Sequence, residues 1–296
     1  MAEVEVALGT KLFSREKKLQ KLLDSVPETI ISTVYIADDG NEDHRPLFDK
    51  EYPFDLVVLD LEYDAGLGAG RKAIVDACDE DYLLIVDTDH EVPDNVDALV
   101  EILNERPEYG GVSGIVNENG DKSTLLHDFE EHGEVLLRTI SDDKQEQTAA
   151  GRNFIEFDFL PNAAMFRMEC LEDYCWDPFY VIEREHIDFY VGHWRETDWK
   201  FACCFDVEFP HHPGGSSFYL QNRESFNKFI RSNDYFLEKW GYSTILGVED
   251  WMGMMSGDKP FSPLPTPPLP IEWQAKASIY RRELKRKYYS VTSILG

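Results

Sequence analysis

The chain has little positive charge and no long apolar run. Its 296 residues carry 29 Lys and Arg side chains against 57 Asp and Glu, so the formal net charge is −28. A protein with that field repels polyanions, and we expect no nucleic acid among its partners. No segment approaches the roughly 18 consecutive apolar residues of a membrane-spanning helix, and the N-terminus lacks a signal-peptide pattern. We therefore predict neither a membrane-spanning nor a classically secreted protein.

Cysteine is scarce and shows no paired CxxC spacing. The five cysteines, an odd number, indicate neither a zinc site nor a disulfide framework, and they fit a reducing cytoplasm. The acidic residues are spread along the whole chain, which favours a solvated surface suited to very high salt over a local anion-averse function. These observations predict a cytoplasmic protein.

Common phosphate-binding fingerprints are also missing. The glycine turn DAGLGAGRK at residues 64–72 does not have the GxGxxG spacing, and the strand expected before it ends in acids that would repel a pyrophosphate. No Walker lysine pattern is present. Hydride transfer on a dinucleotide and P-loop chemistry are therefore disfavoured.

Apolar runs alternate with helical patterns through the first half of the chain. We expect helices at 14–26, with Ser14 as N-cap, at 70–78, and after Asp94 or Asn95. The expected strands lie at 4–9, 32–40, 54–64, 82–92 and 110–116. This alternation predicts an α/β fold with a mostly parallel central sheet and helices on both faces.

The pattern changes after about residue 116. Residues 117–150 are polar and acidic, which predicts a hairpin or mobile loop. Six prolines in residues 259–270 predict an extended connector. Residues 271–296 contain a basic helix candidate in which rings and bases alternate. We expect this tail to contact a membrane surface peripherally, with docking on the acidic body of its own or a second subunit as the alternative.

Two carboxylates end the apolar run YLLIVDTDHEV at residues 82–92. Side chains alternate along a strand, so Asp87 and Asp89 point the same way. Hard oxygen ligands suit Mn²⁺ or Mg²⁺, which accept their remaining ligands from water and substrate phosphates. Acids that end strands are also common helix caps, but ligands of α/β sheets bind outside the carboxyl ends of the strands. The sequence therefore predicts a divalent metal site at this edge.

Four motifs follow one another along the chain. They are YIADDG (35–40), the run from YDAGLGAGRK to DTDHEVP (63–93), FLPNAAMFRMECL (159–171), and the run from WDPFY through REHIDF to HHPG (176–214). In this order they resemble the motifs of the inverting, family 2 nucleotide-sugar glycosyltransferases with the GT-A fold. The likeness covers about residues 4–215, and within the family it is strongest to haloarchaeal enzymes that assemble the S-layer N-glycan on dolichyl phosphate.

The resemblance implies roles for the acids at the strand ends. Asp39 would bind the uracil or ribose side of the donor, and Asp64 and Arg71 would line its pocket, with Arg71 able to pair with phosphate. Asp89 would be the direct metal ligand, and Asp87 a ribose or water-mediated one. A histidine after the last motif would reach back to the metal or diphosphate; of His211 and His212 we assign His212.

The resemblance also places the catalytic base in REHIDF. Inversion needs a group that removes the proton of the acceptor hydroxyl. His186 stands where the family usually has its base aspartate, so the base is one of Glu185, His186 and Asp188. We slightly prefer Asp188.

The expected function is transfer of a sugar from a UDP-sugar to a lipid-linked, dolichyl phosphate glycan in protein N-glycosylation, by metal-dependent inverting displacement. A hexuronic acid is favoured by family likeness, with Arg167, Arg184 and Arg195 as candidate partners of its carboxylate. The alternatives are a sugar nucleotidyltransferase of similar fold and a catalytically inactive sugar-binding protein. We divide the chain into a nucleotide-sugar-binding half (1–115), an acceptor and catalytic half (116–220) and a C-terminal helical extension (221–296).

Overall fold

The computed structural model describes residues 5–41, 45–123, 125–141, 143–223, 225–247 and 269–295. The proline connector predicted at 259–270 lies almost entirely outside these ranges. Within them, no helix is long and apolar enough to cross a membrane. All five cysteines are free, and four of them are buried.

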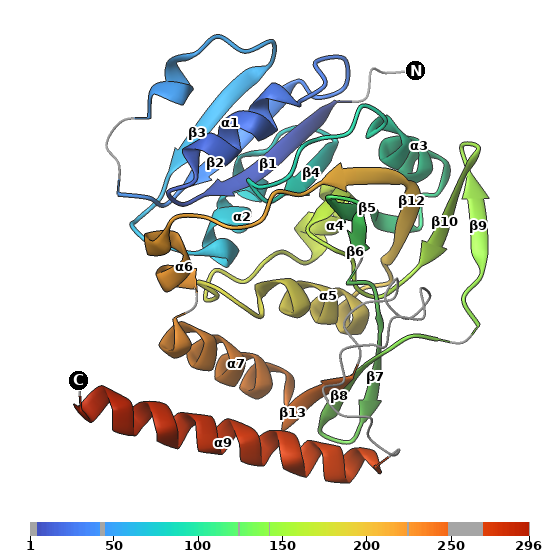
Figure 1. The fold of residues 1–296 in the computed structure, drawn as a ribbon. Coiled ribbons are helices and arrows are strands. Elements are labelled where there is room, and N and C mark those ends of the chain that lie inside the picture. The colour runs from blue at the N-terminus through green and yellow to red at the C-terminus, as the bar shows by residue number, and fades with distance from the viewer. Residues whose placement is uncertain are drawn as a thin grey trace.

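A ten-stranded sheet forms the centre of the molecule (Figure 1). Its order is β3-β2-β1-β4-β11-β5-β12-β10-β9, and β6 pairs with β5. The strands are β1 (Val6–Leu12), β2 (Thr33–Asp38), β3 (Asp55–Asp60), β4 (Tyr82–Val86), β5 (Tyr109–Glu118), β6 (Asp121–Ser123), β9 (Glu146–Ala149), β10 (Arg152–Glu156), β11 (Ala163–Arg167) and β12 (Lys200–Pro210). The predicted α/β fold with a large central sheet is confirmed.

The sheet is mixed, so the prediction that it is mostly parallel is wrong: four of its strand pairs are parallel and five are antiparallel. The first four strands in sequence pair in parallel, as do β5 and β12. Between these groups β11 runs antiparallel to both β4 and β5, and β10 is antiparallel to its neighbours. Because β11 belongs to the second half of the sequence but pairs with β4, the sheet joins the two predicted halves. Their division near residue 115 stays a prediction.

Helices cover both faces of the sheet. The leucines of α1 (Glu16–Asp24) and α3 (Asp97–Glu105) pack on one face. The other face is covered by α2 (Leu67–Ala77), α4 (Met168–Asp173) and α5 (Glu185–Glu196). Along β1 successive side chains alternate, so Ala7 joins the second core and Leu8 the first. Burial on both faces explains why the strands are continuous apolar runs.

The predicted helix caps are wrong. Arg15 is the N-cap of α1, while Ser14 has a φ of 48° and precedes the cap. Val96, rather than Asp94 or Asn95, is the N-cap of α3, and neither cap residue makes a side-chain capping bond. Ser14 belongs to the turn between β1 and α1, and the side chain of Arg15 reaches the carboxyl edge of the sheet, where it pairs with Asp89.

In the described ranges, a second, smaller sheet, three α-helices and a short 3-10 helix complete the fold. Residues 117–150, predicted as a hairpin or loop, contribute the antiparallel hairpin β7 (Asp128–His132) and β8 (Val135–Thr139). Strand β13 (Thr244–Gly247) adds to β8 in parallel. The remaining helices are α6 (Ser217–Arg223), α7 (Phe226–Trp240) and α9 (Ile271–Leu295), together with the short helix η1 (Pro46–Asp49). Figure 1 shows α9, which confirms the predicted basic helix, along the outer side of α7 and β13.

Candidate active site

Asp89 lies in a polar cluster just beyond the carboxyl end of β4. It is 6% exposed, and its Oδ2 forms an ion pair with the guanidinium of Arg15. His211 Nε2 lies 3.4 Å from the same oxygen, and His90 Nδ1 lies 3.7 Å from Oδ1. Burial alone would raise the pKa of Asp89, but the hydrogen bond from His211 and the charge of Arg15 hold it well below its usual range. Asp89 is therefore a carboxylate throughout the physiological pH range.

The two histidines after β12 have different partners. The imidazole of His212 pairs with Glu91, although its backbone N–H donates to the Asp89 carbonyl at 2.7 Å. The ring of His211 lies between Asp89 and Glu118, and its hydrogen bond to Asp89 raises its pKa. We therefore correct the assignment: His211, rather than His212, presents its ring nitrogen at the Asp89 carboxylate.

Asp89 and His211 fit a divalent ion as two neighbouring ligands. Adjacent ligands of an octahedral Mg²⁺ or Mn²⁺ site lie about 3 Å apart, and Oδ2 of Asp89 is 3.4 Å from Nε2 of His211. In the part of the chain that the structure describes, no group of three or more His, Cys, Asp or Glu side chains could hold a metal ion. An ion bound here would depend on water and substrate phosphate for its remaining ligands.

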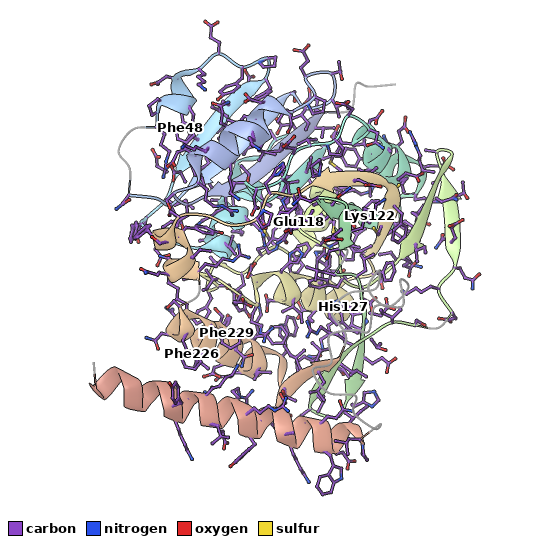
Figure 2. The ribbon with its side chains drawn as sticks, in the orientation of Figure 1. Phe48, Glu118, Lys122, His127, Phe226 and Phe229 are labelled. Carbon is purple, nitrogen blue, oxygen red and sulfur yellow. The ribbon has the colours of Figure 1, made fainter. Side chains whose placement is uncertain are left out.

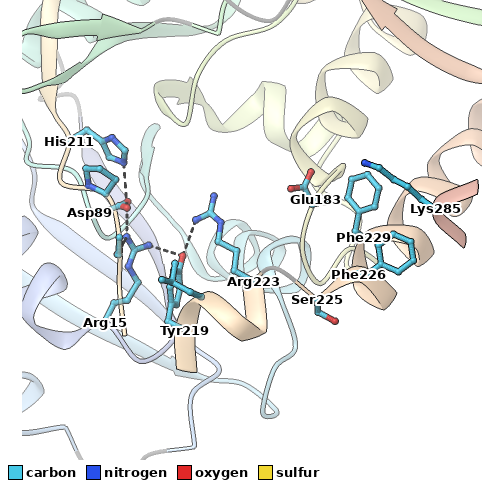
Figure 3. A pocket seen from close by; sticks show the side chains of 13 residues that line it. Arg15, Asp89, Glu183, His211, Tyr219, Arg223, Ser225, Phe226, Phe229 and Lys285 are labelled. Atoms are coloured by element: carbon cyan, nitrogen blue, oxygen red, sulfur yellow. Dashed lines mark hydrogen bonds and ion pairs between the residues drawn. The ribbon is translucent and has the colours of Figure 1, made fainter. Parts of the chain in front are cut away.

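Two arginines and a tyrosine extend this cluster into a cavity of about 530 Å³ (Figure 3). Arg15 and Arg223 both donate to the hydroxyl of Tyr219 at 2.9 Å. Figure 3 shows the rings of Phe226 and Phe229 on the other side of the cavity, beside the side chain of Lys285 from α9. The cavity thus has an ionic end, suited to phosphate, and an apolar end.

Arg71 on α2 links Asp87 to Glu185. Its guanidinium is 2% exposed, with Nη2 at 3.3 Å from Asp87 Oδ1 and Nη1 at 3.4 Å from Glu185 Oε1. Asn162 donates to the other oxygen of Asp87 at 3.2 Å. Burial opposes ionisation of Asp87, but the charge of Arg71 together with those of His90 and Arg223 outweighs it and lowers the pKa. The expectation that Arg71 pairs with donor phosphate is therefore corrected, since it is buried between two carboxylates and positions them.

Glu185, the first residue of α5, lines a second cavity of about 270 Å³. This cavity adjoins the first, because Arg15, Tyr219 and Arg223 line both. Oε2 of Glu185 is buried and has no hydrogen-bond partner among the described residues. Burial raises the pKa of Glu185, although Arg71 opposes the shift. A carboxylate with one unoccupied oxygen and a raised pKa is suited to accept a proton.

Asp188, one helical turn along α5, has a different environment. It is fully buried and lines neither cavity. Its Oδ1 accepts hydrogen bonds from Tyr180 at 2.9 Å and Trp240 at 2.8 Å, and its Oδ2 accepts one from Lys239 at 2.9 Å. Both oxygens are therefore occupied by groups that fasten α7 to α5. This placement speaks against Asp188, the base slightly preferred from the sequence.

His186 lines the same cavity as Glu185 but is a poor proton acceptor. Its Nε2 donates to the carbonyl of Leu160 at 2.8 Å, and its ring meets Phe159 and Tyr190 edge-on. Burial lowers the pKa of His186 to about 3, with a further contribution from the charge of Arg71. The imidazole is neutral and weakly basic, so Glu185 is the base candidate that the geometry favours.

The two acids expected at the donor side are both paired. Asp39 is fully buried, its Oδ2 accepts the backbone N–H of Gly66 at 2.8 Å, and Lys11 Nζ lies 2.5 Å from its Oδ1. Asp64 lies 2.5 Å from Lys228 on α7. Lys11 and Asp64 line the second cavity, whereas Asp39 does not. Asp39 thus holds Lys11 and the glycine turn in place.

Four residues of the site were not singled out from the sequence: Arg15, Asn162, Tyr219 and Arg223. Arg15 falls in the helix expected at 14–26, and Asn162 falls in the motif FLPNAAMFRMECL. A cation soon after the first strand of an acidic chain was an available signal. Tyr219 and Arg223 lie on α6, beyond the motifs, and no local pattern indicates that α6 closes over the cavity.

Comparison with known proteins agrees with the fold. The model of glycosyl transferase family 2 matches residues 10–175, more than half of the chain. No curated protein matches the sequence. A structure of GalNAc-T7 with UDP, GalNAc and Mn²⁺ is similar with a TM-score of 0.60 and 10% identity over 80% of this chain. That match takes in 48% of the GalNAc-T7 chain, so this chain covers about half of its length.

Structures of S. aureus TarS, residues 1–349, are also similar. The complex with UDP has a TM-score of 0.52 and 15% identity, covering 81% of this chain and 73% of TarS. The complex with UDP-GlcNAc has a TM-score of 0.50 and 15% identity, covering 71% and 60%. These likenesses show the GT-A fold, and the family match extends over the sheet edge that carries Asp87 and Asp89. The chain therefore belongs to glycosyl transferase family 2.

Proposed function

We propose that this glycosyltransferase moves a sugar from a UDP-sugar to an acceptor hydroxyl with inversion at the anomeric carbon. The observation that carries the proposal is Glu185, a buried carboxylate with one unpaired oxygen that lines a cavity adjoining the Asp89 cluster. A base on one side of the cleft and an ionic cluster on the other are the two parts that in-line displacement at a sugar carbon requires.

The donor diphosphate is assigned to the ionic end of the larger cavity. Asp89 and His211 would hold Mn²⁺ or Mg²⁺, which neutralises the departing diphosphate when bound. Arg15 and Arg223 supply positive charge from either side of Tyr219. Similar structures contain UDP, UDP-GlcNAc or Mn²⁺, which supports this donor class. Asp87, positioned by Arg71 and Asn162, is assigned to the ribose.

The acceptor hydroxyl is assigned to the Glu185 side. Glu185 Oε2 accepts the hydroxyl proton as the oxygen attacks the anomeric carbon from the face opposite the diphosphate. The guanidinium of Arg71 stays on Oε1 and holds the carboxylate in place. The neutral ring of His186 covers the same cavity and helps to exclude water.

A lipid-linked acceptor, as in glycan assembly on dolichyl phosphate for S-layer N-glycosylation, fits the apolar end. Leu220, Phe226 and Phe229 form an apolar wall beside Arg223 and Lys285. A lipid phosphate could place its phosphate at Arg223 and Lys285 and its apolar chain against the rings and Leu220. The acidity of the chain is consistent with a haloarchaeal source.

A hexuronic acid would need a cation for its carboxylate, and the three candidates differ. Arg167 is bonded to the backbone carbonyls of Tyr109 and Leu103, on the side of the sheet away from both cavities. Arg195 is paired with Glu131. Arg184 alone of the three lines the cavity that contains Glu185, so we assign the uronate to Arg184.

A panel of UDP-sugars, tested for protection against thermal unfolding with and without Mn²⁺, checks the donor assignment. We expect one UDP-sugar to raise the Tm in the presence of Mn²⁺, and Asp89→Asn to remove most of that shift. Asp206→Asn, which changes an exposed carboxylate on β12, is the matched control and should behave as the wild type. If no UDP-sugar shifts the Tm under any condition, the donor class is wrong.

A further inference from the structure

The outer face of α9 exposes an apolar and aromatic stripe. Trp273, Tyr280 and Leu284 are 63%, 62% and 47% exposed, and Tyr288, on the same side, is 67% exposed. Positions separated by seven, four and four residues lie on one face of a helix, so these side chains form a continuous line. Large apolar side chains are expensive to leave in water, and a line of them marks a contact surface.

The opposite face of α9 packs against the rest of the chain. Ala275 is buried, and the hydroxyl of Ser278 lies 2.8 Å from that of Thr244 on β13. Arg282 donates to the carbonyl of Ser243 at 3.1 Å, and Arg286 forms an ion pair with Asp234 on α7. These contacts realise the predicted docking on the chain's own body, and they fix the stripe outward. Figure 2 shows side chains of α9 pointing away from the rest of the molecule.

Charge identifies the partner of this face. Residues 271–288 carry six basic side chains and only two acidic ones, Glu272 and Glu283, in a chain of net charge −28. At 100° per residue, Lys276 flanks the stripe on one side and Arg281 on the other, and both are exposed. An anionic surface would attract α9 and repel the acidic body, which orients the molecule with the stripe toward that surface.

We propose that α9 lies flat on an anionic lipid bilayer, with the stripe at the level of the headgroups. Trp and Tyr side chains favour this interfacial region, and flanking Lys and Arg side chains pair with lipid phosphates. Within its described residues α9 is not apolar enough to cross the bilayer, so contact is peripheral. Lys285 of the same helix lines the larger cavity, and docking therefore brings the cleft to the membrane surface. This binding does not depend on the transfer reaction.

Flotation of the full chain with vesicles, without any sugar donor, tests the proposal. We expect the wild type to float with phosphatidylglycerol vesicles at moderate salt and poorly with phosphatidylcholine. The triple variant Trp273→Ser, Tyr280→Ser, Leu284→Ser should lose about tenfold or more of the bound fraction. Tyr63→Ser, which removes a 51% exposed ring elsewhere, is the matched control and should float as the wild type. Circular dichroism checks that α9 persists in every variant.

A second variant isolates the charge. Lys276→Glu with Arg281→Glu keeps the stripe and should weaken flotation most at low salt, where screening is least. Equal flotation of the wild type and the triple variant, or no flotation of the wild type, would overturn the proposal. Conversion of a dimer into a monomer by the triple variant, with no vesicle binding, would overturn it in favour of a protein interface.

Discussion

The two sides of the cleft are formed by different structural elements. Most of the proposed donor side follows β1 and β4, strands that pair on both sides in the centre of the sheet. The proposed acceptor side consists of Glu185 on α5 and the wall formed by Phe226, Phe229 and Lys285 on α7 and α9, beyond the residues that the family model matches. Under this proposal the sheet positions most groups that bind the donor, while helices later in the chain line the acceptor site. The predictions below change residues on one side of the cleft at a time.

A large effect is expected on the donor side, at Asp89. Asp89→Asn keeps the side-chain shape and can still accept a hydrogen bond from Arg15, but it loses the charge that a metal ion requires. We expect turnover to fall by more than about 10²-fold and chelation of the wild type to have a similar effect. Initial rates measured with and without added Mn²⁺ check both. Full activity of chelator-treated wild type would show that the Asp-x-Asp interpretation is wrong.

A smaller effect is expected on the acceptor side, at Phe229. Phe229→Ala removes part of the apolar wall, and loss of about 1.5 kcal/mol of burial corresponds to about a tenfold rise in acceptor KM. The KM of the donor should not change. Phe48→Ala, another partly buried ring on the far side of the sheet (Figure 2), is the control. If both variants change donor and acceptor KM alike, the two sides are not separate in function.

The smallest effect is a shift in the pH profile. Burial raises the pKa of Glu185 above that of an ordinary glutamate, and only the ionised form can accept a proton. Turnover should therefore be lost as the pH falls through this raised pKa and should reach its plateau above it. Measuring kcat against pH at saturating substrate locates the inflection. A profile that stays flat well below the ordinary glutamate range would exclude Glu185 as the base.

Sequence patterns predicted the donor side better than the acceptor side for a physical reason. The apolar runs of β1, β2 and β4 are local signals, and parallel strands bring their carboxyl ends to one edge, so the sequence alone predicts that Asp87 and Asp89 lie there. The partners of Asp188 come from α7, about 50 residues later. No local pattern shows that Trp240 and Lys239 occupy its oxygens, so the sequence slightly favoured Asp188 over Glu185 as the base.

Other wrong predictions also arise from contacts between residues far apart in the sequence. His211 and His212 are neighbours in sequence, and only the register of β12 beside β5 decides which ring faces Asp89. The sequence did not show that Arg71 is buried between Asp87 and Glu185, since this burial depends on the packing of α2 against α5. Arg71 was therefore expected to bind phosphate. The sheet of β7, β8 and β13 joins segments more than 100 residues apart. Long-range packing, rather than propensity, decided each of these cases.

Glu185→Gln compared with Asp188→Asn tests the central claim, that one carboxylate of α5 does chemistry and the other holds the fold. We predict that Glu185→Gln lowers kcat by about 10²–10⁴-fold with little change in donor KM and with an unchanged Tm. Asp188→Asn should instead cost about 2 kcal/mol of unfolding free energy, while the folded variant retains most of its turnover. The substitution removes the buried one of the two carboxylates that pair with Lys239, and Asp177 remains. Near-wild-type turnover of Glu185→Gln, together with the large loss in fully folded Asp188→Asn, would contradict the account.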